Sequence, residues 1–212
     1  MYQRVLGEDF AALHPQLRTY FGPIPSGFEG VGAGRYRSAG LRVRALRPVF
    51  TVLGWCRIAF PEFDEDVPFT VRNTPRADGA LSAVRTFAFA NATRTMRDVM
   101  RADGGRIVDR IGASGFLEVE LALEASAGRL RMESGRLALR LWRLRVPLPR
   151  IVRLSLIEEA IPGGVQHVDV RMRAPLLGEI YGYTGTFTYE VRREHRRGSM
   201  VRIRTRDAIC GP

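Results

Sequence analysis

Lysine is absent from this chain of 212 residues, so all 33 of its basic side chains are arginines. Against 22 acidic residues they leave a formal net charge of +11. Arginine-biased codon usage in a GC-rich genome is the simpler explanation, because the arginines are scattered along most of the chain. The alternative is a surface selected for phosphate or carboxylate groups, which a guanidinium group binds with two parallel hydrogen bonds.

Cysteines and long apolar runs are also scarce. The two cysteines, Cys56 and Cys210, lie far apart, which excludes a dense disulfide framework and a zinc site built on cysteines. No apolar run approaches the length of a membrane-spanning helix. Glu8 and Asp9 stand where a signal peptide would have its apolar stretch. We therefore expect a cytoplasmic protein with reduced thiols.

The familiar cofactor and catalytic motifs are missing as well. The chain has no P-loop, no Gly-x-Gly-x-x-Gly after a strand and no His-Glu-x-x-His. The segment from Gly112 to Gly115 has the wrong spacing for a nucleophile elbow, so we interpret it as a turn. The three histidines, His14, His167 and His195, are dispersed. We expect no cofactor and no metal site.

Two-residue alternation is abundant, and it is typical of β-strands. The clearest case lies within residues 175–191, where one face is mainly aromatic and the other carries glycine, threonine and glutamate. The aromatic face holds Tyr181, Tyr183, Phe187, Tyr189 and Val191. Similar alternation occurs over residues 67–72, 85–89, 117–123, 152–156 and 168–172.

Consecutive strands at short spacing predict an antiparallel meander. We expect it to curl into a barrel-like, calycin-like sheet, because so many strands do not remain a flat open sheet. The expected fold class is therefore mainly β (α+β). Hairpin turns are expected at Ala127-Gly128 and at Ser134-Gly135.

The N-terminal segment has a helical pattern instead. Apolar residues recur three or four positions apart, at Tyr2, Leu6, Phe10, Leu13, Leu17 and Phe21. Pro15 interrupts the pattern, so we expect a helix that ends near Leu13 and a short second turn that begins at Pro15. This segment either plugs one end of the barrel or packs on the concave face of the sheet, with Phe10 buried.

Residues 1–191 have the composition of a single β-rich domain with an N-terminal helix, and no linker or repeat divides them. An Arg-rich C-terminal tail occupies residues 192–212. The simpler interpretation is a solvated basic tail, with an edge strand around Val201 and Ile203 that is blunted by charge. The alternative is an arm that binds anions.

Several short segments together resemble a known bacterial family. They are Tyr2 to Phe21, Arg47-Pro48, Phe60 to Glu62, Asp66 to Asn73, Arg85 to Phe87 and Gly182 to Thr188, in that order. Over residues 2–191 the chain is similar to domain of unknown function 4166. The resemblance implies a single-domain protein of the actinobacterial type, and it supplies no activity and no catalytic residues. The chain departs from the family's pattern around Asn73 to Ser82, where the hairpin looks short, and in its Arg-rich tail.

A few polar residues at inward-facing positions define the candidate site. Arg85 shares a strand face with Phe87 and Phe89, so we expect it to point into the barrel. A buried arginine needs a partner, which Glu158, Glu159 or a ligand anion could supply. Because adjacent strand residues point to opposite faces, only one of the two glutamates enters the interior. Burial would raise its pKa and suit it to general acid or base catalysis; the simpler interpretation is a solvated or Arg-paired carboxylate.

Tyr181 and Tyr183 are expected to line the same pocket as Phe87 and Phe89. Buried tyrosine hydroxyls need partners, so they also offer hydrogen bonds to a ligand. The alternative is that these four aromatic side chains fill the core and leave no room for a ligand.

Two classes of function remain. In the first, which we favour, the barrel binds a small apolar or weakly anionic organic molecule. As an enzyme it would be an isomerase or cyclase that uses acid–base chemistry, as in bacterial secondary metabolism. In the second, the protein is a non-catalytic binding module whose Arg-rich surface meets anionic lipid or nucleic acid. Nucleic acid is not expected under the first class, and the sequence indicates no oligomeric state.

Overall fold

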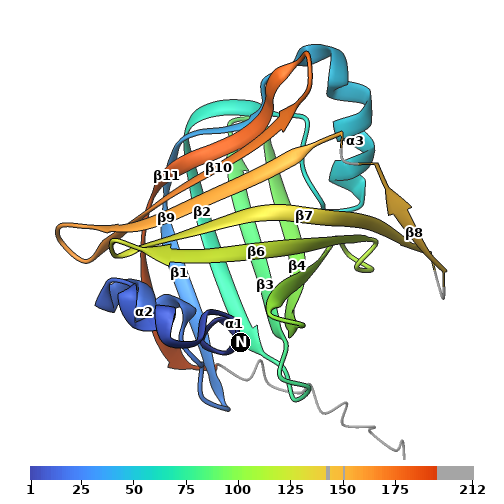
Figure 1. The fold of residues 1–212 in the computed structure, drawn as a ribbon. Helices are drawn as coiled ribbons and strands as arrows, with labels where there is room; N and C mark the ends of the chain where they lie inside the picture. The colour runs from blue at the N-terminus through green and yellow to red at the C-terminus, as the bar shows by residue number, and fades with distance from the viewer. Residues whose placement is uncertain (142–143, 150, 195–212) are drawn as a thin grey trace, which may run out of the picture.

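Most of the chain forms one antiparallel sheet that closes on itself (Figure 1). The computed structural model describes residues 1–141, 144–149 and 151–194. Within these ranges the strands are β1 (Phe28–Leu41), β2 (Phe63–Pro75), β3 (Leu81–Phe89), β4 (Ala92–Asp103), β5 (Arg106–Ile111), β6 (Leu117–Ser126), β7 (Arg129–Leu141), β8 (Leu144–Leu148), β9 (Arg153–Ile161), β10 (Val165–Ala174) and β11 (Gly178–Arg193).

Ten of these strands make a closed barrel, in the order β6-β5-β4-β3-β2-β1-β11-β10-β9-β7, and the pairing of β6 with β7 completes it. β1 and β11, the first and last strands of the described residues, lie side by side, from Phe28 opposite Arg193 to Leu41 opposite Tyr181. β8 lies outside the barrel and pairs with the end of β7. The expected fold class, a mainly β barrel with an N-terminal helical segment packed on it, is confirmed.

The join between β7 and β9 is short. These strands pair only from Leu130 to Glu133, and beyond that point β7 pairs with β8 instead. The prediction of a turn at Ser134-Gly135 is wrong, because β7 continues through these residues. They begin a β-bulge: the register passes from Leu121 opposite Ser134 to Val119 opposite Leu137, so β7 has one extra residue. The turn at Ala127-Gly128 is confirmed, since it joins β6 to β7.

The N-terminal segment comprises α1 (Tyr2–Leu6), a 3-10 turn η1 (Gly7–Ala12) and α2 (Pro15–Phe21). The first helix ends earlier than expected because Gly7 has a φ of 58°, which is outside the helical region. A 3-10 turn advances 120° per residue, so Phe10 no longer shares the face of Leu6 and is only half-buried. Leu6, Leu13 and Leu17 are buried as expected. Figure 1 shows this segment at one end of the barrel.

The opposite end of the barrel is covered by a second helical segment, η2 (Arg44–Leu46) followed by α3 (Arg47–Trp55). Phe50 of α3 stacks on Tyr181 with 5.3 Å between ring centroids. Phe60, just after the helix, packs against Phe87 and Phe89. No helix in the described ranges is both long and apolar enough to cross a membrane.

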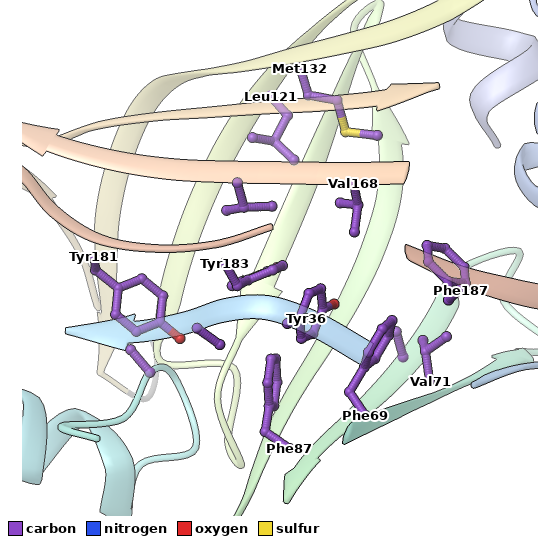
Figure 2. Packing of buried hydrophobic residues seen from close by; sticks show 14 of the residues in the cluster. Tyr36, Phe69, Val71, Phe87, Leu121, Met132, Val168, Tyr181, Tyr183 and Phe187 are labelled. Atoms are coloured by element: carbon purple, nitrogen blue, oxygen red, sulfur yellow. The ribbon is translucent and has the colours of Figure 1, made fainter. Parts of the chain in front are cut away.

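A cluster of aromatic rings fills much of the barrel interior (Figure 2). Tyr36 stacks on both Phe69 and Phe87, with centroid distances of 3.9 and 5.4 Å and nearly parallel planes. Tyr183 and Phe187 of β11 meet these rings edge-on or tilted. Rings packed in this way contribute about 0.5–1.5 kcal/mol per pair beyond the burial of their area.

Candidate functional site

A cavity of about 130 Å³ lies inside the barrel, between the two helical segments. Its wall combines inner-face residues of the strands with residues of α1, α2 and the segment after α3. Most of the wall is apolar and includes Met96, Met100, Met132, Met172, Leu121 and Leu156. An engineered cavity of about 150 Å³ with such a lining binds benzene, so this space has the size of one small organic molecule.

Arg85 of β3 contributes a cationic side chain to this wall. Its guanidinium Nη1 donates to the carboxylate Oδ1 of Asp98 on β4. The side chain is 19% exposed, because it borders the cavity. Arg85 therefore points inward as the sequence predicts, and its carboxylate partner is Asp98 rather than Glu158 or Glu159.

Asp109 of β5 adds a second carboxyl beside this pair. Asp98 lies opposite Ile111 and Asp109 opposite Met100, so the two aspartates are diagonal neighbours on paired strands. Burial and then the charge of Asp98 hold the pKa of Asp109 well above its usual range, while Arg85 opposes this shift. Asp98 Oδ2 and Asp109 Oδ1 are buried, and neither has a hydrogen-bond partner among the described residues. Two buried carboxyl oxygens of residues in the cavity wall therefore lack a partner.

Glu158 of β9 reaches the cavity from another part of the wall. It is 4% exposed, and its Oε2 accepts a hydrogen bond from Nε2 of the fully buried Gln166 on β10. Burial raises the pKa of Glu158 to about 7, although Gln166 and Arg85 both act to lower it. A carboxyl with this pKa can both accept and release a proton near neutral pH.

Glu159 lies on the outer face of the barrel. Its Oε2 is 2.8 Å from Nε of Arg129, and its Oε1 is 3.3 Å from Nδ1 of His167. The structure thus separates the two glutamates, and it is Glu158 that enters the interior.

The four predicted aromatic residues divide into two groups. Tyr181 and Tyr183 border the cavity, whereas Phe87 and Phe89 belong to the packed cluster and do not line it. Burial raises the pKa of Tyr183 to about 12, so its hydroxyl keeps its proton at neutral pH and can donate. Tyr2 and Tyr20 of the N-terminal helices also border the cavity.

Four polar residues of this region were not predicted from the sequence: Asn73, Asp98, Asp109 and Gln166. The sequence does contain a signal for the two aspartates. Asp98 shares its strand face with Met96 and Met100, and Asp109 shares its face with Ile107 and Ile111. A single carboxyl in an otherwise apolar strand face indicates a polar group inside the barrel. In the described residues no group of three or more His, Cys, Asp or Glu side chains is arranged to hold a metal ion.

The fold and its interior define a small β-barrel protein with a buried aromatic cluster. The chain belongs to the family described as Domain of unknown function (DUF4166), whose model matches residues 13–187. The family resemblance inferred from the short motifs is therefore confirmed. Comparison with curated proteins and with solved structures gives no match.

Proposed function

We propose that this protein binds a small, mainly apolar organic molecule inside the barrel and exchanges a proton with it through Glu158. The observation that carries the proposal is the composition of one cavity wall. It is largely apolar, yet it contains a carboxyl group with a pKa of about 7 and two unpartnered aspartate oxygens. Perturbed carboxyls in a largely apolar cavity are the usual mark of acid–base sites.

The proposal gives the polar groups of the wall different roles. Glu158 is the residue that takes a proton from one position of the ligand and returns it at another, which is an isomerisation or a cyclisation. Arg85 and Asp98 hold each other in place, so Arg85 positions the aspartates rather than carrying a ligand anion by itself. The unpartnered oxygens of Asp98 and Asp109 favour a ligand with a hydroxyl group or another hydrogen-bond donor.

The experiment begins with probes of the cavity. Benzene and phenol should raise the melting temperature, and phenol should do so more strongly because its hydroxyl can donate to Asp98 or Asp109. Leu121→Phe adds volume to the wall and should abolish both effects. Glu159→Gln, on the outer face, should leave both unchanged.

Native mass spectrometry of the protein from its own host then identifies the natural compound. A bound mass that is present in the natural protein and absent from Leu121→Phe supports the proposal. The compound should be converted by the natural protein and bound without conversion by Glu158→Gln. Failure of both probes to bind, or equal binding by Leu121→Phe, would refute a ligand site in the cavity.

A further inference from the structure

The helix that covers one end of the barrel exposes apolar side chains to solvent. Phe50 of α3 is buried against the barrel, whereas Val49, Val52 and Trp55 face outward. Trp55 is 74% exposed. Apolar side chains grouped on one outward helix face form an exposed patch of the kind that marks an interaction site.

A second apolar projection lies at the same end of the barrel. The turn between β10 and β11 carries Leu176, which is fully exposed, and Leu177, which is exposed by half. Leu176 has a φ of 65°, a conformation that favours glycine over leucine. The strand after this turn is tied to the segment before α3, because the backbone N–H of Arg42 donates to Ile180 O at 2.9 Å. Figure 1 shows the turn beside α3.

The surroundings of these side chains are basic. Residues 41–61 contain four arginines and no acidic residue; the next acidic residue is Glu62. Arg44, Arg47 and Arg57 are exposed, and none of them has an acidic side chain within salt-bridge distance in the described part of the chain. Arg44 and Arg47 also line an open cleft of about 600 Å³, where Arg42, Arg94 and these two arginines outnumber Glu62 and Asp64. Many other arginines of the barrel are paired, as Arg85 is with Asp98, so this end carries charge that is not neutralised.

We propose that α3 and the β10–β11 turn form a docking surface for an anionic lipid bilayer. Trp55, Leu176 and Leu177 enter the interfacial layer, where tryptophan and leucine are favourable. Arg44, Arg47 and Arg57 contact lipid phosphate groups, because an anionic surface attracts basic side chains close to it. A symmetric dimer through this face would bring its unpaired arginines together, and a nucleic acid would leave the apolar tips in water.

Vesicle sedimentation of the full chain tests the proposal. We expect binding to vesicles of equal parts phosphatidylcholine and phosphatidylglycerol, and little binding to phosphatidylcholine alone. The double variant Arg44→Gln/Arg47→Gln should bind about tenfold more weakly or worse. The control Arg18→Gln/Arg193→Gln removes the same charge from exposed positions near the opposite end, so it should lose much less. Equal losses in the two double variants would show diffuse charge attraction and overturn the docking surface.

Tryptophan fluorescence tests the apolar half of the surface. Trp142→Phe leaves Trp55 as the only tryptophan, and its emission should shift to the blue when anionic vesicles are added. Leu176→Ser/Leu177→Ser in this background should weaken binding and reduce the shift. An unchanged emission would overturn insertion of Trp55. A blue shift that appears when the protein alone is concentrated would assign the face to a second copy of the chain.

Discussion

At the scale of single residues, the interior of the barrel gives three chemically similar carboxyl groups different neighbours. Asp98 faces a guanidinium group, Asp109 lies next to Asp98, and Glu158 is held by an amide. Burial raises the pKa of all three, and the neighbouring charge or hydrogen bond decides by how much. The position of each group relative to Arg85 therefore controls where protons reside in the cavity.

Replacing Arg85 should expose the cost of an unpaired buried charge. Arg85→Met removes the partner of Asp98, and we expect a loss of about 3–5 kcal/mol in the free energy of unfolding, measured in urea. The double variant Arg85→Met/Asp98→Leu should recover most of this loss, since neither charge remains. A single variant as stable as the natural protein would mean that the ion pair is not a structural element.

Glu158 should make stability depend on pH. Folding raises its pKa from 4.5 to about 7, so the folded state holds a proton that the unfolded state releases in this window. The free energy of unfolding therefore falls as pH rises from 4.5 to 7 and is lowest above pH 7. Glu158→Gln should remove this contribution and add about 3 kcal/mol at pH 8, with little change at pH 4.

Urea titrations at several pH values measure this effect, with Glu159→Gln as the matched control. Glu159 lies outside the barrel and pairs with Arg129, so its substitution should not produce the same gain. A gain from Glu158→Gln that is equal at pH 4 and pH 8 would contradict the raised pKa.

At the scale of elements, the N-terminal segment is held at several separate positions rather than along one continuous helical face. Leu13 forms a bridge with Gly128 in the β6–β7 turn, and Tyr20 of α2 packs on Tyr189 at 4.6 Å. Gly30 of β1 makes room for Tyr189, because a Cβ atom there would collide with the tyrosine ring. The segment is thus part of the barrel core at this end.

Two substitutions in this segment should differ in cost. Leu17 is fully buried, so Leu17→Ala should lower the free energy of unfolding by about 2–5 kcal/mol. Phe10 is only half-buried, so Phe10→Ala should cost about 1–2 kcal/mol. Denaturant titration of both variants measures the difference, and a larger loss for Phe10→Ala would contradict the 3-10 geometry of η1.

At the scale of the whole molecule, closure of the barrel depends on the pairing of β1 with β11, which are far apart in the sequence. β11 continues to Arg193, two residues past the expected domain boundary, and Arg192 Nε lies 3.2 Å from Oε1 of the buried Glu29. The proposed edge strand around Val201 and Ile203 falls outside the described residues. Strand β11 therefore includes Arg192 and Arg193, which were expected to belong to the tail.

Two truncations distinguish barrel from tail. A chain that ends at Glu194 should keep the melting temperature of the full chain and bind polyanions more weakly at low salt. A chain that ends at Val191 loses one partner of Glu29 and should be less stable by roughly 1–2 kcal/mol. Thermal unfolding measures the stability of the two truncated chains, and heparin binding measures their affinity for polyanions. Equal melting temperatures for the two chains would contradict a stabilising role of Arg192.

Much of the fold was predictable because the local sequence of a strand shows which residues share a face. The alternation of Tyr181 and Tyr183 with Gly182 and Thr184 identified the inner face of β11 before any partner strand was known. The prediction of a turn at Ser134-Gly135 failed because a small residue followed by glycine suits a turn and a bulge equally well. Only the register against Val119 and Leu121 distinguishes the two.

The sequence by itself determined many of the strands, their inward faces, the family and the inward position of Arg85. The strand faces depend on residue type and two-residue spacing, and the family on short motifs in a fixed order. The tertiary structure alone decided that Arg85 meets Asp98, that Glu158 rather than Glu159 enters the cavity, and that Phe87 packs in the core. These outcomes depend on which strands become neighbours and in which register when the barrel closes. The pKa of each carboxyl follows from that closure, since burial and neighbouring charges exist only in the folded chain.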